Sequence, residues 1–417
     1  MRVLVIGSGG REHALSWALS ASPLLTKLWV APGNPGTALI ADNVGISAIH
    51  TERLVQFAHE NEIDLVVPGP EGPLVAGLAD AMAEAGIRCV GPTAAAARLE
   101  GSKAFAKQVC DAAAIPTALW EQFTDADEAR EFIRRRGAPV VVKADGLASG
   151  KGVVVAATVE EAEAALDSIM RDRAFGDSGA AVVIEECLAG EEVSLFALCD
   201  GTEAVFLGAA QDHKRLGDGD AGPNTGGMGA LSPVPGLDAA AAMDGFIRPA
   251  LAEMARRGTP FRGVLFAGLM LTEDGAKLIE YNVRFGDPEC QALLPRLRSD
   301  LLPALLAACD GELGRFDLRW TDNASVAVVM AAPGYPAAPE PGSDIGDLSA
   351  AAAVPGALVF QAGTRVEGGH LLADGGRVLT VCGTGPDLAA ARAVAYDAVG
   401  RVPWREGFFR RDIGVRA

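Results

Sequence analysis

The chain has 417 residues, a length that corresponds to about two to four domains, and 49% of them are hydrophobic, enough for packed cores. Its net charge of −18 argues against a nucleic-acid or anionic-membrane partner, because a protein that binds such a partner needs a basic surface. Seven cysteines are scattered without a CxxC pair, and no apolar window suits a signal peptide or a membrane span, so we expect a cytoplasmic protein with reduced cysteines.

Residues 1–92 alternate apolar runs with helical patterns. The runs at 3–6, 27–31, 63–68 and 87–91 are expected strands, and the segments 12–20, 51–60 and 74–85 are expected helices. Such alternation predicts a doubly wound parallel sheet.

A glycine loop, GSGGREH (7–13), follows the first expected strand. A strand that leads through glycines into a helix offers backbone N–H groups to an anion. The dinucleotide pattern GxGxxG fails, because its third glycine would fall at Glu12. The loop therefore favours a phosphate site without a dinucleotide, and a tight turn without a ligand is the alternative.

Residues 101–190 predict a compact α+β module that moves as a lid, from about residue 120 onward. Strands are expected at 140–143, 153–156 and 181–186, with a helix at 159–170. The first two strands flank the loop VVKADGLASGKG (141–152), which lacks the Ser or Thr of a Walker motif at Gly152. A glycine flap between two strands suits a triphosphate, and Lys143 on the incoming strand can reach phosphate oxygens.

The remaining residues predict two further α+β units, at 191–324 and 325–417. The first holds strands 194–199 and 204–211, a helix at 239–257, and a hairpin of 264–271 with 277–285 joined by an Asp-Gly turn. The second holds strands at 325–331, 358–362 and 378–383. The cluster QDHKR (211–215) before the glycine-rich loop 217–229 suits a small anionic substrate.

The hairpin's second strand carries a candidate metal site. Alternate residues of a strand share a face, so Glu280, Asn282 and Arg284 are expected on one face and Tyr281 on the other. Carboxylate and amide oxygens suit Mg²⁺. A solvated polar face is the alternative, and the unusual run RFGDPE (284–289) favours the functional interpretation.

Together, these stretches resemble a known family. They are GSGGREHAL (7–15), APGNPGT (31–37), EGSKAF (100–105), VVKADGLASGKG (141–152), IEECLAGEE (184–192), QDHKR (211–215), GPNTGGMGA (222–230), YNVRFGDPECQ (281–291) and RRDIGVRA (410–417). The chain thereby resembles the ATP-grasp ligases and, within them, the glycinamide ribonucleotide synthetases (phosphoribosylamine–glycine ligases). One departure is Gly72, where the family pattern has Ala.

The resemblance implies a multidomain α/β and α+β ATP-grasp fold. Its parts would be an N-terminal doubly wound domain (1–100), an ATP-grasp region with the lid (101–190), a central domain with the metal site (191–324) and a small C-terminal α+β domain (325–417). The implied reaction joins glycine to 5-phospho-β-D-ribosylamine with ATP through a glycyl phosphate, the second step of de novo purine synthesis. A monomer, with transient channelling from the preceding enzyme, is expected.

The resemblance also implies site residues. ATP would be bound by Lys103, Lys143, Gly150, Lys151, Gly152, Glu185, Glu186, Cys187, Leu188 and Glu192. Phosphoribosylamine and glycine would contact Gly9, Gly10, Arg11, Glu12, His13, Glu71, Asp212, Lys214, Asn224, Thr225, Gly226, Gly227, Arg284 and Asp287. Glu280 and Asn282 would hold Mg²⁺ or Mn²⁺, and Lys143, Asp212 and Arg284 would serve catalysis.

Three rival functions stay open at this point. The nearest is an ATP-grasp ligase of the same pathway that uses formate or bicarbonate. The broken GxGxxG pattern counts against an NAD-dependent oxidoreductase. The presence of Lys143, Glu280, Asn282 and Arg284 together counts against a nucleotide sensor without activity.

Overall fold

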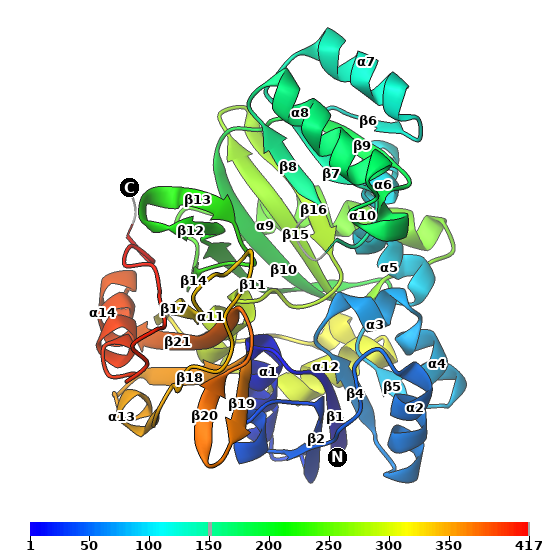
Figure 1. Ribbon diagram of the computed structural model, residues 1–417. Helices are drawn as coiled ribbons and strands as arrows, with labels where there is room; N and C mark the ends of the chain where they lie inside the picture. The colour runs from blue at the N-terminus through cyan, green and yellow to red at the C-terminus, as the bar shows by residue number, and fades with distance from the viewer. Residues whose placement is uncertain (149–151, 416–417) are drawn as a thin grey trace.

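The computed structural model describes residues 1–148 and 152–415 (Figure 1). Within them the strands form a five-stranded, a four-stranded and an eight-stranded sheet, with two small two-stranded ribbons. No helix in these two ranges is long and apolar enough to cross a membrane.

The N-terminal sheet is parallel, in the order β3-β2-β1-β4-β5. Its strands are β1 (Arg2–Gly7), β2 (Lys27–Pro32), β3 (Asp42–Asn43), β4 (Leu65–Pro68) and β5 (Arg88–Cys89). The helices of this region are α1 (Gly10–Ser20), α2 (Thr51–Glu60), α3 (Glu71–Val75), α4 (Leu78–Glu84) and α5 (Ala94–Gly101). Alternate residues of β1 enter two different cores, Val3 on one face and Leu4 on the other, so the sheet is covered on both faces as predicted.

One expected helix is divided. The segment 74–85 was predicted as a single helix, but α3 ends at Val75 and α4 begins at Leu78. Gly77, between them, has a φ of +91°, a conformation that breaks a right-handed helix and that glycine adopts without strain. The first of the two helices, α3, begins at Glu71, earlier than expected.

The segment predicted to be a lid, called the lid below, is a four-stranded antiparallel sheet in the order β6-β9-β7-β8. Its elements are β6 (Trp120–Phe123), α7 (Ala126–Arg136), β7 (Val140–Ala144), β8 (Val153–Ala156), α8 (Val159–Leu166), the π-helical turn η2 (Asp167–Arg171) and β9 (Val182–Glu186). Helices α7 and α8 cover one face, with Ile133 and Leu166 packed on Val142 (Figure 1). The strand β6 and helix α7 were not predicted from the sequence.

The eight-stranded sheet spans the central and C-terminal parts of the chain, in the order β16-β15-β10-β11-β14-β17-β21-β18. Its strands are β10 (Glu191–Asp200), β11 (Ala204–Asp212), β14 (Gly229–Ser232), β15 (Arg262–Thr272), β16 (Gly275–Asn282), β17 (Ala324–Ala331), β18 (Ala357–Gln361) and β21 (Arg377–Gly385). Because β14 pairs with β17, one sheet joins segments that the sequence presents as two units.

Helices and short ribbons complete these layers. The helices are α6 (Lys103–Ala112), α9 (Ala239–Ala242), α10 (Arg248–Arg256), α11 (Glu289–Leu293), α12 (Leu301–Asp310), α13 (Ser349–Ala352) and α14 (Leu388–Val399). The ribbons pair β12 (Arg215–Gly217) with β13 (Ala221–Asn224), and β19 (Thr364–Glu367) with β20 (His370–Ala373). In Figure 1 the N-terminal sheet and the C-terminal strands lie at one end of the molecule and the lid at the other.

The strand expected at 277–285 ends earlier. β16 stops at Asn282, so Arg284 lies beyond the strand and not on its alternating face as predicted. The pairing of β16 with β15 is regular from Glu280 to Asn282, so Glu280 and Asn282 share one face of the strand. Tyr281 faces the other way, is buried, and donates its hydroxyl to the carbonyl of Phe246.

Candidate active site

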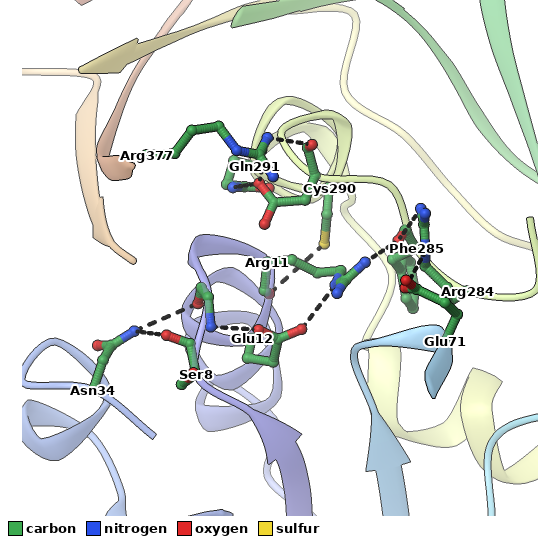
Figure 2. Close-up of polar contacts among 12 residues, drawn as sticks. Ser8, Arg11, Glu12, Asn34, Glu71, Arg284, Phe285, Cys290, Gln291 and Arg377 are labelled. Carbon is green, nitrogen blue, oxygen red and sulfur yellow. Dashed lines mark hydrogen bonds and ion pairs between the residues drawn. The ribbon is translucent and has the colours of Figure 1, made fainter. Parts of the chain in front are cut away.

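Three distant segments meet where α1 begins: the glycine loop, the loop after β16, and β21 (Figure 2). Glu12 lies at the centre of the glycine loop. Its carboxylate accepts the Gly9 N–H at 2.5 Å and pairs with Arg11 at 2.8 Å. A Cβ atom added at Gly69 would lie 1.7 Å from Glu12 Oε1, so the carboxylate packs against bare backbone. Glu12, the residue that breaks the dinucleotide pattern, therefore occupies the space inside this loop with its own side chain.

Arg11 connects the glycine loop to the loop after β16. Its guanidinium donates to the Phe285 carbonyl at 2.8 Å (Figure 2). Burial works against the charged form, but the carboxylates of Glu12, Asp287 and Glu71 outweigh burial and raise the pKa of Arg11. Arg11 is thus a permanent buried cation between two predicted substrate loops.

His13 connects the glycine loop to the C-terminal part of the sheet. Its Nδ1 accepts the Gln361 N–H at 2.9 Å, and its ring packs edge-on against Phe360. Burial lowers the pKa of His13 to about 4, so the ring is neutral at pH 7. One ring nitrogen of this predicted substrate residue is therefore committed to a backbone contact.

Arg284 gathers three acidic or amide groups around the end of β16. It contacts Glu71, Glu100 and Asn282 Oδ1, each at 3.2 Å. Glu100 also accepts the Val283 N–H at 2.7 Å. The sequence placed Glu71, Asn282 and Arg284 in the site but missed Glu100, although Glu100 opens the motif EGSKAF.

Glu280 is an ionised carboxylate surrounded by cations. Burial favours its neutral form, but Lys214, Lys103, Lys143 and Arg284 outweigh burial and lower the pKa of Glu280 to about 2. Glu280 and Asn282 supply one carboxylate and one amide from the same strand face, a donor set that fits a Mg²⁺ or Mn²⁺ ion whose other ligands are phosphates and water. No group of three or more His, Cys, Asp or Glu in 1–148 and 152–415 forms a cluster that could hold a metal by itself.

Asp212 is a half-buried carboxylate on the substrate side, at the end of β11. Burial raises the pKa of Asp212 to about 6, against the attraction of Lys214. Its Oδ1 accepts no hydrogen bond from any described residue. Close by, Lys214 forms an ion pair with Glu192, and Ser194 donates to Glu289 at 3.2 Å. Glu289, although within the RFGDPE run, was not among the predicted site residues.

The loop at 224–227 is held by the C-terminal part of the chain. Arg377 donates to the carbonyls of Gly226 and Asp287, at 2.6 Å each, and Tyr335 accepts the Gly226 N–H at 2.9 Å. Thr225 donates to the Lys214 carbonyl at 2.8 Å and accepts the Gly227 N–H at 3.0 Å. The partner residues Arg377 and Tyr335 carried no signal in the sequence motifs. Asn224, the last residue of β13, is exposed.

The predicted nucleotide residues lie around the lid strands β7 and β9. Lys143 and Glu185 form a buried ion pair at 2.9 Å, and Lys103 donates to the Gly146 carbonyl at 3.3 Å. Glu186 accepts the Leu119 N–H at 3.1 Å. Cys187 and Leu188 follow directly after β9. The carbonyl of Gly152 accepts the Ala144 N–H at 2.8 Å, while Gly150 and Lys151 lie outside the described residues.

Comparison with known proteins defines the class first. Residues 101–290 match the ATP-grasp (A) domain of phosphoribosylglycinamide synthetase, so this protein is an ATP-grasp enzyme. A biotin carboxylase from Campylobacter jejuni, at 16% identity, shares the fold with a TM-score of 0.73, covering 98% of this chain and 91% of that one.

The rest of the chain gives the family. The N and C domains of phosphoribosylglycinamide synthetase match residues 1–100 and 325–416, so the chain belongs to the phosphoribosylglycinamide synthetase family. It is 55% identical to a phosphoribosylamine–glycine ligase of Brucella melitensis, over 100% of this chain and 98% of the relative. The structure of a phosphoribosylamine–glycine ligase from Thermotoga maritima has a TM-score of 0.88 at 34% identity, covering 99% of this chain and 100% of that one.

Proposed function

We propose that this protein joins glycine to 5-phospho-β-D-ribosylamine with ATP, giving glycinamide ribonucleotide, ADP and phosphate, the second step of de novo purine synthesis. Beside the family membership, one observation carries the proposal: Lys143 and Arg284 hydrogen-bond to residues on either side of Glu280 along β16, at the Ile279 carbonyl and at Asn282 Oδ1. The charges of Lys103 and Lys214 act on Glu280 as well. Such a set of cations around a carboxylate suits a triphosphate with a divalent ion.

The first step activates glycine. A carboxylate oxygen of glycine attacks the γ-phosphorus of ATP, and the bond between the γ-phosphorus and the β-phosphate oxygen breaks. ADP departs, and glycyl phosphate is formed. The transfer needs charge compensation and alignment, which Lys103, Lys143 and Arg284 supply. Mg²⁺ or Mn²⁺ held by Glu280 and Asn282 would neutralise phosphate charge.

The second step forms the amide. The amine nitrogen of phosphoribosylamine attacks the acyl carbon, the C–N bond forms, and inorganic phosphate leaves. We assign the released proton to Asp212, whose pKa of about 6 leaves it ionised at pH 7 and whose Oδ1 accepts no hydrogen bond from the described residues. The lid excludes water from the glycyl phosphate, so that hydrolysis does not compete.

The proposal assigns the remaining predicted residues by position. ATP lies along the lid strands, with Glu185 beside Lys143, the backbone of Glu186, Cys187 and Leu188 at the adenine, and Glu192 at the ribose. The phosphoribosylamine and glycine lie between the glycine loop 9–13, the loop 224–227 and Asp287. We further propose that the enzyme works in the cytoplasm as a monomer and receives its labile amine by transient contact with the preceding enzyme.

A coupled ADP-release assay with freshly prepared phosphoribosylamine tests the function. We expect release to require ATP, glycine and the amine together, and hydroxylamine to replace the amine in part by trapping glycyl phosphate as a hydroxamate. Formate and bicarbonate, offered in place of glycine, are the controls for other ATP-grasp reactions. ADP release without glycine, or equal release with formate, would refute the assignment.

A further inference from the structure

A buried Lys–Glu–Lys triad lies where the lid meets the body of the molecule. Glu185, on β9, pairs through Oε1 with Lys143 of β7 and through Oε2 with Lys107 of α6, both at 2.9 Å. All three side chains are 3% exposed. Lys107 follows Lys103 by four residues on α6, so both project from one side of that helix. No motif in the sequence analysis singled out Lys107.

Hydrogen bonds connect the triad to β16, the strand that carries the predicted metal ligands. Lys107 donates to Thr117 Oγ1 at 2.6 Å, and the Thr117 hydroxyl donates to the Leu278 carbonyl at 2.7 Å. Lys143 donates to the neighbouring Ile279 carbonyl at 3.3 Å. Both lysines therefore connect to β16 at the two residues that precede Glu280.

The charges of the triad do not balance. Two ammonium groups share one carboxylate, and Glu185 Oε1 makes an ion pair but no hydrogen bond with Lys143. Burying an unbalanced charge is unfavourable unless an anion completes the site. With Lys107 removed, Glu185 would neutralise Lys143 alone.

We propose that Lys107 is a positioning residue for nucleotide binding: it holds Glu185 through one oxygen, so that Lys143 keeps an uncompensated positive charge for the phosphates of ATP. This inference rests on the proposed function, because it takes Lys143 as a phosphate ligand. Lys107 itself contacts Glu185 and Thr117, and it acts on the nucleotide through Lys143.

Calorimetric binding of ATP and of adenosine separates this role from a structural one. We expect Lys107→Met to weaken ATP binding about tenfold, or about 1.4 kcal/mol, and to leave adenosine binding unchanged. Lys107→Arg keeps the charge and should retain most of the ATP affinity. Lys27→Met, at an exposed lysine of β2, is the matched control and should bind both ligands as the parent does. Equal losses for ATP and adenosine would overturn the proposal.

A double-mutant cycle with Lys143→Met completes the test. If Lys107 acts through Lys143, Lys107→Met should cost no further ATP affinity in the Lys143→Met background. Additive losses would overturn the inference and leave the proposed function intact, whereas unchanged ATP binding in Lys143→Met alone would count against the proposed nucleotide site. If Lys107→Met fails to fold, Thr117→Val is the substitute variant. It keeps every charge of the triad but removes the hydrogen bond that Lys107 donates to Thr117, and it must weaken ATP binding more than adenosine binding.

Discussion

Glu280 keeps its charge because four cations lie around it, and its neighbour Tyr281 takes no part in that cluster. The two residues point to opposite faces of β16, where Tyr281 is fixed by its hydrogen bond to the Phe246 carbonyl. A substitution at each position therefore separates metal use from packing, although the two residues are adjacent in the chain.

We expect Glu280→Gln to raise the Mg²⁺ concentration needed for half-maximal ADP release by about one to two orders of magnitude, because one ligand loses its charge. Tyr281→Phe should leave that concentration unchanged and cost about 1 kcal/mol of stability, the usual effect of one hydrogen bond. Mg²⁺ titrations of ADP release, with thermal melts as the folding control, measure both. A similar shift of the metal requirement in Tyr281→Phe would contradict the metal site.

At the scale of elements, the segment 69–72, which joins β4 to α3 and includes the start of α3, presents Glu71 to Arg284 and contains two glycines with different surroundings. A Cβ at Gly69 would clash with the Glu12 carboxylate at 1.7 Å, whereas a Cβ at Gly72, inside α3, meets nothing within 4 Å. The departure from the family pattern at Gly72 therefore leaves the geometry of this connection intact.

We expect Gly72→Ala to preserve activity and to stabilise the protein by up to about 1 kcal/mol, because alanine restricts the unfolded chain and favours the helix. Gly69→Ala should destabilise the protein by about 1–3 kcal/mol, as overpacking does, and should lower turnover by displacing Glu12. Denaturant unfolding and ADP release compare the two variants. Equal tolerance at both positions would mean that Glu12 is not held as described.

For the whole molecule, the decisive feature is that β14 pairs with β17, so the C-terminal strands extend the central sheet. Arg377 on β21 also holds the carbonyls of Gly226 and Asp287. The C-terminal segment is thus part of the sheet and of the walls of the site.

We expect a chain ending at residue 324 to lack a stably folded central sheet, because removing β17 exposes the edge and the apolar face of β14. Circular dichroism and limited proteolysis, with the full-length chain in parallel, measure the loss of cooperative unfolding and of protection. A protease-resistant fragment that still binds ATP would show that the central part folds independently.

Local signals in the sequence determined much of this protein. The period of apolar residues and the glycine positions predicted the parallel N-terminal sheet, the two lid strands β7 and β8, and the shared face of Glu280 and Asn282. These features depend on φ/ψ preferences and on side-chain alternation over a few residues, which the sequence states directly. The early end of β16 was missed, because a strand's last residue depends on where its partner β15 stops pairing.

Only the tertiary structure determined which distant residues contact one another. Glu185 lies between Lys107 and Lys143, His13 accepts from Gln361, and Arg377 reaches Asp287. These contacts join residues 42 to 348 positions apart in the chain. The sequence gives the type of each ionisable residue. The pKa and the role of a buried group also depend on which charges surround it, and those surroundings are set by the packing of distant segments.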